Sequence, residues 1–180
     1  MRDTIELNGR TYTVRIESDN DMGAPWEEND GHGVVSEWTT RSKRAGELVL
    51  AVDQRYGLNG KRRFYNLSAT IKTAHADGWG LNDEARAALA ARIGREPTKR
   101  EVVAEAVRLD YEHLRGWCNG SWYWVGVIVS DDATGEQSSL WGMESDDGGG
   151  LEECAAELAQ DMDRAHAIAN RFADAMACGV

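Results

Sequence analysis

Residues 121–131, SWYWVGVIVSD, decide the fold class. The run is nearly continuous in aromatic and β-branched residues, which predicts a strand that is central in a sheet or buried on both faces. The segment DATGEQ then turns the chain, and SSLWGMES at 138–145 predicts the partner strand. Gly126 leaves a slot on this hairpin, and we expect the ring of Trp141 to fill it from across the strands.

The N-terminal part predicts further strands. In TIELNGRTYTVRIES, residues 4–18, Asn8 and Gly9 supply the two positive-φ positions of a type I′ hairpin turn. VVSEWTT at 34–40 and GELVLAVD at 46–53 predict two more strands, and QRYGLNGKRR at 54–63 predicts a loop.

Capping residues mark the helices. Asn66 and Gly78 bound one helix, Asn82 and Gly94 bound a second, and the capping box of Thr98 and Glu101 starts a third that runs to about residue 117. A last helix, 151 to about 177, carries apolar residues at steps of four and three, which predicts a stripe that docks on the sheet. The stripe consists of Leu151, Ala155, Leu158, Met162, Ala165, Ala169, Phe172 and Met176.

These elements predict an α+β protein. We expect a mostly antiparallel sheet of about five to six strands, with three to four helices packed mainly on one face, in a single domain over residues 1–180. No apolar run approaches the ~20 residues that a membrane helix needs, so we expect no membrane partner. The alternative for the last stripe is a homodimer through a helix–helix contact.

Charge is segregated along the chain. The net charge of −11 divides into −6 for residues 1–40, +7 for residues 41–100 and −12 for residues 101–180. An acidic surface repels nucleic acid phosphates and attracts basic partners, so we expect no direct contact with nucleic acid. Eight residues of the last third form the candidate partner-binding surface, here called the acidic set: Asp131, Asp132, Glu144, Asp146, Asp147, Glu153, Glu157 and Asp161.

The irregular stretch PWEENDGHG at 25–33 is the alternative site. Its oxygen ligands resemble those that hard cations prefer, but the spacing does not fit an EF-hand, so a metal or small ligand is the lesser hypothesis. In the other interpretation, Trp26 packs in the core and the acids face water. The residues of this candidate ligand or metal loop are Glu27, Glu28, Asp30 and His32.

Nucleophilic catalysis and cofactor binding have little support. The chain lacks a G-x-S-x-G sequence and a Walker loop, and Cys118 lies among aromatic residues where a thiol is usually inert. We therefore predict no catalytic residue, no resident metal and no cofactor. Of the other cysteines, Cys154 is expected near the core and Cys178 at an exposed end, while His166 is expected to point away from the apolar stripe.

Several stretches together resemble a family of small proteins encoded in tailed phages and prophages. They are PWEENDGHGVVSEW, RRFYN with HADGWG, LRGWCNGSWYWVGVIV and SLWGMESD, which span roughly residues 20 to 160. The first of these is fairly specific. The family has no assigned activity, so the resemblance implies no catalytic residue. It implies production in the cytoplasm of a bacterial host.

From the resemblance and the charge we expect a phage accessory protein. Our prediction is a non-catalytic acidic binder that inhibits a host nucleic-acid-handling or defence complex, of the anti-CRISPR or antirestriction type. Its partner is a host protein complex with a basic surface. The alternative is a small metal- or ligand-binding enzyme that uses the Asp30/His32 loop.

Overall fold

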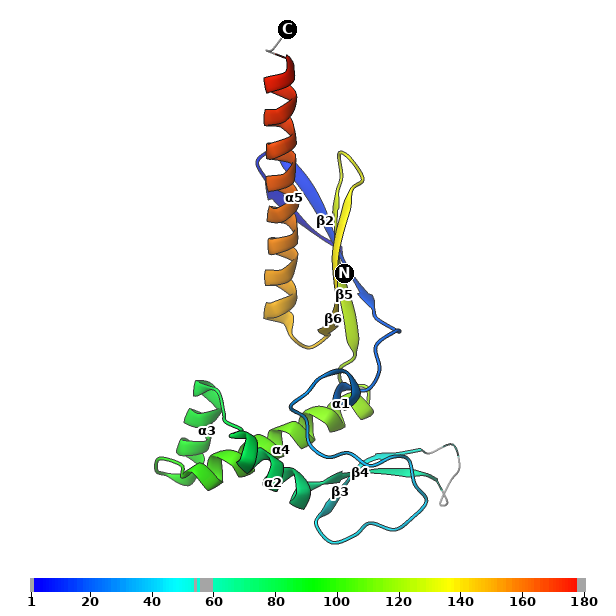
Figure 1. The fold of residues 1–180 in the computed structure, drawn as a ribbon, viewed down its shortest axis with the longest axis vertical. Helices are drawn as coiled ribbons and strands as arrows, with labels where there is room; N and C mark the ends of the chain where they lie inside the picture. Colours follow the sequence, from blue (N-terminus) through cyan, green and yellow to red (C-terminus); the bar gives the residue numbers. More distant parts are fainter. Residues whose placement is uncertain (1, 54, 56–59, 178–180) are drawn as a thin grey trace. The chain divides into compact units, whose positions relative to one another are not determined.

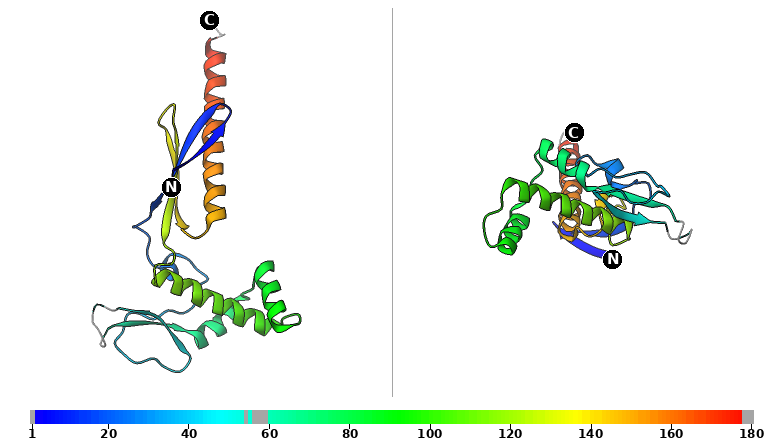
Figure 2. Two further views of the ribbon diagram at one scale, coloured as in Figure 1. Left: turned by 180° about the vertical axis from the view of Figure 1, so that it is seen from behind. Right: turned by 90° about the horizontal axis from the view of Figure 1, so that it is seen from below.

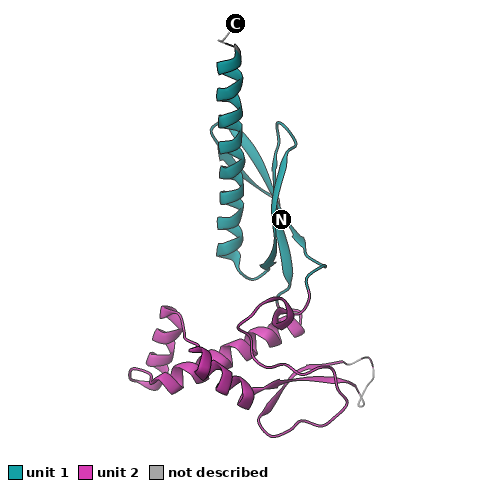
Figure 3. Cartoon of the chain, in the orientation of Figure 1, with its two compact units in different colours: residues 1–22, 122–180 teal, residues 23–121 magenta. Residues whose placement is uncertain are grey.

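The computed structural model describes residues 2–53, 55 and 60–177, and it divides the chain into two compact units (Figure 3). Unit 1 consists of Met1–Met22 and Trp122–Val180, and unit 2 of Gly23–Ser121. One domain over residues 1–180 stays a prediction; the described residues form two hydrophobic core clusters, one in each unit. The α+β class is confirmed, with the strands distributed over two sheets.

Unit 1 is a four-stranded antiparallel sheet with one helix. The strands β1 (Arg2–Leu7), β2 (Arg10–Ser18), β5 (Trp124–Asp131) and β6 (Gln137–Glu144) lie in the order β1-β2-β5-β6. Asn8 and Gly9 have φ values of 49° and 80° in the β1–β2 turn, as their sequence predicts. Helix α5 (Gly148–Ala177) lies along one face of the sheet and continues past its end (Figures 1 and 2).

The core of unit 1 lies between α5 and this sheet face. Tyr12, Val14, Val127 and Val129 point towards the helix, where Leu151, Cys154, Ala155 and Ala159 meet them. The first half of the predicted stripe therefore docks on the sheet. The second half does not, because the helix continues where the sheet has ended: Phe172 and Met176 are 69% and 79% exposed.

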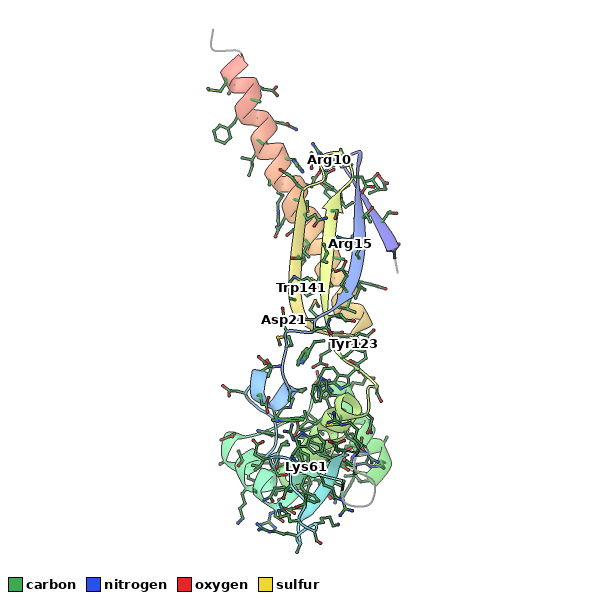
Figure 4. All side chains as sticks on the ribbon, turned by 90° about the vertical axis from the view of Figure 1, so that its right-hand side faces the viewer. Arg10, Arg15, Asp21, Lys61, Tyr123 and Trp141 are labelled. Atoms are coloured by element: carbon green, nitrogen blue, oxygen red, sulfur yellow. The ribbon has the colours of Figure 1, made fainter. Side chains whose placement is uncertain are left out.

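The opposite face of the sheet contains the predicted slot. A Cβ atom on Gly126 would lie 2.2 Å from the Trp141 ring, so the ring occupies the space that a side chain would need. Trp141 is 46% exposed on β6, and its position is labelled in Figure 4. On β5 itself, Ile128 is 7% exposed and Trp124 4% exposed, which confirms burial on both faces of this central strand.

Unit 2 packs helices on a two-stranded sheet. Strands β3 (Glu47–Val52) and β4 (Arg62–Asn66) pair antiparallel, with α1 (Pro25–Glu28), α2 (Leu67–Asp77), α3 (Asp83–Ile93) and α4 (Lys99–Cys118) around them. The side chains of Asn66 and Asn82 accept hydrogen bonds from Ala69 N and Ala85 N. Thr98 and Glu101 form the predicted capping box. Helices α2, α3 and α4 thus begin where their caps predict.

Two predictions near β4 are wrong. Residues 34–40 form isolated bridges, Val35 to Tyr65 and Thr39 to Arg62, in place of a continuous strand. The Ser36 hydroxyl accepts the hydrogen bond of the Phe64 N–H at 3.0 Å. A side-chain oxygen therefore takes the place that a backbone carbonyl oxygen would have in a continuous β-ladder. The end of the predicted loop 54–63 instead belongs to a strand at residues 62–66, two of which are arginines; residues 54 and 56–59 of that loop lie outside the described residues. Arg63 is accommodated because its guanidinium stacks on Trp26 and Trp38 at 4.9 and 5.1 Å.

Candidate functional site

Asp131 is buried, so its predicted place on an exterior binding surface is wrong. It has no exposed area. Its Oδ2 lies 2.6 Å from Arg10 Nη1 and 2.9 Å from His166 Nε2, and its Oδ1 accepts the Ala133 N–H at 2.8 Å. The register places Asp131 opposite Tyr12, on the sheet face that α5 covers. His166 accordingly points towards the sheet, contrary to its predicted orientation.

The pKa of Asp131 is lowered from its ordinary value despite this burial. Desolvation works in the opposite direction, but the Ala133 N–H and the Arg10 guanidinium favour the charged form. The carboxylate therefore stays ionised, held by Arg10 of β2 and by the backbone of the β5–β6 turn. Its role is structural, and it contributes no accessible charge.

Other members of the acidic set lie at two ends of the β5–β6 hairpin. Asp132 is exposed beside the turn and accepts a hydrogen bond from the Thr13 hydroxyl at 2.8 Å. Glu144, Asp146 and Asp147 lie at the opposite end, about 24 Å away along strands of this length. Asp147 accepts the Gly150 N–H at 3.0 Å at the start of α5. These residues do not form one continuous patch.

The exposed face of α5 holds the other three members. Glu153, Glu157 and Asp161 follow each other at intervals of about 6 Å along the helix, and all three are exposed. Arg164 forms an ion pair with Asp161, so the charge of this end is partly neutralised. Within the described part of the chain, Glu153 and Glu157 have no ion pair with a basic side chain.

The charge segregation survives folding at the level of units. Unit 1 contains 17 acidic and five basic residues, a net charge of −12, whereas unit 2 contains 14 acidic and 15 basic residues, a net charge of +1. The arginines Arg41, Arg92 and Arg108 of unit 2 pair with Glu47 and Glu105 of the same unit. Unit 1 therefore carries the acidic character of the whole chain.

The four residues of the 25–33 loop do not come together as a metal site. Glu27, Glu28 and Asp30 are exposed, and Glu28 accepts the Gly23 N–H at 2.8 Å. Across the part of the chain that the structure describes, no three His, Cys, Asp or Glu side chains gather as a metal-binding group. Within the loop, His32 alone enters a polar network in the interior of unit 2.

The partner of His32 is Asp110 of helix α4. His32 Nδ1 lies 2.7 Å from Asp110 Oδ1, and the two side chains are 18% and 9% exposed. The other carboxylate oxygen, Oδ2, accepts the Gly33 N–H at 2.9 Å and the Tyr65 hydroxyl at 2.6 Å. Desolvation, and then the hydrogen bond to Asp110, raise the pKa of Tyr65, so the phenol remains a donor.

Local structure holds this network in position. Tyr65 lies on β4, and a Cβ atom on Gly33 would meet its hydroxyl at 2.3 Å, so only glycine lets the loop approach this closely. The His32 ring stacks on His113, one helical turn from Asp110, with 5.9 Å between centroids. We predicted His32 but not Asp110 or Tyr65. A signal for Asp110 was present, because it interrupts the apolar series Val103, Val107 and Leu114 at helical spacing.

A hollow of about 450 Å³ borders this network in unit 2. His32, Asp110 and Asn82 contribute its polar groups, and apolar side chains of α3, α4 and the α2–α3 connection form most of the remaining lining. The lining includes Trp79, Leu81, Ala85, Ala106 and Leu109. The hollow is open to solvent and combines apolar side chains with the largely buried His32–Asp110 pair, groups that a small ligand could contact together.

The remaining nucleophile candidate is not activated. Burial raises the pKa of the Cys118 thiol to about 11, so the inactive thiol form predominates at neutral pH. Cys154 is buried in the core of unit 1, as expected. Cys178 lies outside the described residues.

Over its described length the protein contains no helix that combines the length and the apolar character needed to cross a bilayer. Comparisons with protein-family models, with curated proteins and with solved structures gave no match to this chain.

Proposed function

We propose that the protein is a non-catalytic binder whose acidic unit engages a basic surface on a partner protein complex. The observation that carries the proposal is the net charge of −12 in unit 1 against +1 in unit 2. Solubility alone does not require charge to collect in one unit, whereas electrostatic attraction of a basic partner benefits from it.

The exposed face of α5 is the part of unit 1 best suited to this contact. Glu153 and Glu157 are exposed and lie on a rigid helix about 6 Å apart, comparable to the spacing of phosphates along a nucleic acid strand. Asp146, also exposed, precedes the helix. A basic channel that binds nucleic acid is therefore the partner surface that we infer, and the setting that we propose is a phage or prophage protein acting on a host nucleic-acid-handling or defence complex.

Charge reversal on this face tests the proposal. The variant with Asp146→Lys, Glu153→Lys and Glu157→Lys keeps the acids with structural partners, namely Asp131, Asp132, Asp147 and Asp161. A control variant reverses two exposed acids of unit 2, Asp77→Lys and Glu84→Lys. Both proteins, and the wild type, are immobilised and used to capture partners from bacterial host lysate at increasing salt concentrations.

We expect the wild type and the control to retain the same partner at low salt and to release it as salt rises. We expect the unit 1 variant to lose at least tenfold in the amount captured, while its circular dichroism spectrum is unchanged. Equal capture by all three proteins would exclude this face of α5 as the contact.

A further inference from the structure

The His32–Asp110 pair fixes the protonation pattern of the imidazole. An ionised carboxylate can only accept hydrogen bonds, so at 2.7 Å the Nδ1 of His32 must donate to Asp110 Oδ1. In the neutral ring this leaves Nε2 without a proton and with its lone pair available. Asp110 Oδ2 is engaged by Gly33 and Tyr65, so the carboxylate cannot rotate away.

The imidazole is also fixed in orientation. Its contact with the His113 ring has an interplanar angle of 12°, and its side chain is 18% exposed. A ring that is held on one face and at Nδ1 keeps its other nitrogen in one place. Pre-organisation of this kind is typical of binding groups, because a ligand need not immobilise the side chain again.

The walls of the hollow favour a flat apolar group. Trp79 and Leu81 are half-buried and Leu109 is 36% exposed, so apolar surface remains in contact with water there. A ring placed on this surface would remove it from water. The position of His32 in the lining puts its remaining nitrogen at the edge of that same hollow.

We propose that this hollow in unit 2 binds a small planar aromatic or heteroaromatic ring that bears an O–H or N–H group, and that Nε2 of His32 accepts the hydrogen bond from that group. Asp110 acts as a positioning residue, because it sets the tautomer and the orientation of the imidazole. The proposal uses residues of unit 2 alone and does not depend on the acidic face of unit 1.

Phenol and anisole form a matched pair of probes. They share the ring, but the methyl group of anisole removes the donor. Each is titrated into full-length ¹⁵N-labelled protein, and the ring nitrogens of His32 and the indole N–H of Trp79 are followed by NMR. We expect both signals to shift with phenol, and phenol to bind about fivefold more tightly than anisole, the ratio that one net hydrogen bond gives.

Variants separate the hydrogen bond from packing. His32→Phe keeps an aromatic ring but removes the acceptor, and should abolish the preference for phenol over anisole. Asp110→Asn should change the tautomer seen in the His32 ¹⁵N shifts and weaken the preference. Trp141→Ala, which removes an exposed tryptophan of unit 1, should leave the preference unchanged.

The wild-type measurement decides the proposal even if a variant does not fold. Equal affinities for phenol and anisole would overturn it, since the hollow would then offer apolar contact alone. Shifts that map to residues elsewhere, or no shift at His32 and Trp79 up to the solubility limit of phenol, would also overturn it.

Discussion

Gly126 and Trp141 show how a single missing side chain shapes a sheet face. The Trp141 ring lies over the glycine of the neighbouring strand, and atoms of the ring would lie 2.2–2.6 Å from an added Cβ. Such distances cannot be kept by a real side chain, so either the ring or the strand must move. The pair therefore works as one packing unit.

We predict that Gly126→Ala destabilises the protein by about 1–3 kcal/mol, the usual cost of overpacking. Denaturant unfolding followed by tryptophan fluorescence measures this loss. The control is Gly149→Ala in the same unit, where an added Cβ meets nothing within 4 Å and a stabilisation of roughly 0.4–1 kcal/mol is expected. If the double variant Gly126→Ala with Trp141→Ala is no more stable than Gly126→Ala, the ring is not the source of the strain.

At the same scale, the candidate site could be predicted only in part. His32 stood out because two glycines flank it in an acidic loop, and the structure does bring it into a polar network. Asp110 lies 78 residues further along the chain, and no local pattern joins the two. Asp131 was misplaced for a similar reason: an acid at a strand end is usually exposed, and its burial depends on the distant Arg10 together with the Ala133 N–H of the following turn.

At the scale of elements, the boundaries of helices were well predicted, because caps are local chemistry. Asn66, Asn82 and Thr98 each satisfy orphan N–H groups within three residues, so the neighbouring sequence contains the whole signal. The strand at 62–66 was missed because its stability comes from other segments. Arg63 is acceptable there only between Trp26 and Trp38, which are distant in sequence.

Helices α3 and α4 are joined by a charged contact that predicts acid sensitivity. Glu105 is bound by Arg108 at 2.7 Å and by Arg92 at 2.6 Å, and these arginines lower its pKa from 4.5 to about 2. Because the folded pKa is lowered, the contact stabilises the fold fully above about pH 4.5, and the contribution disappears as the pH falls towards 2.

We therefore predict that Glu105→Gln lowers the unfolding midpoint at pH 7 and has less effect as the pH approaches 2. Thermal melts at several pH values measure the difference from the wild type. Glu84→Gln, on the exposed surface of α3, serves as the control and should show little change. A difference for Glu105→Gln that stays constant across this range would show that the ion pair is not its source.

The end of α5 provides a second prediction at this scale. Ile168, Phe172 and Met176 form an exposed stripe, with exposed fractions of 54%, 69% and 79%. Phe172→Glu should leave the unfolding midpoint unchanged, because the ring has few contacts to lose. If the stripe supports the helix–helix association that its spacing suggests, the same variant should reduce concentration-dependent sedimentation relative to the wild type. Identical sedimentation at all concentrations would argue against the homodimer.

At the scale of the whole molecule, unit 2 is an insertion within unit 1. The chain leaves unit 1 after Met22 and returns at Trp122, and the two crossing points are neighbours, since Asp19 N donates to Trp124 O at 2.9 Å. Our expectation of a single domain, based on chain length, did not include this insertion. The insertion is hard to predict because strand β2 pairs with β5 across more than 100 residues of sequence. Neither composition nor local periodicity indicates a pairing between strands so far apart in sequence.

This arrangement predicts that unit 2 can be excised. A protein in which residues 23–121 are replaced by a short Gly–Ser linker should retain the β2–β5 pairing and the α5 contact, because its core consists of residues of unit 1 alone. Cooperative thermal unfolding and dispersed amide signals in an NMR spectrum would support this. A spectrum typical of a disordered chain would show that unit 1 requires unit 2 for its stability.

The nested order also has a consequence during translation. The hairpin β1–β2 leaves the ribosome before unit 2, and its partner β5 follows about 105 residues later, a delay on the order of 10 s at ordinary elongation rates. A lone two-stranded hairpin is marginal in water, so Tyr12 and Val14 stay uncovered while the inserted segment emerges. During the interval between synthesis of β2 and of β5, the hairpin lacks its partner strand. A chaperone that shields this hairpin in that interval would raise the yield of native protein.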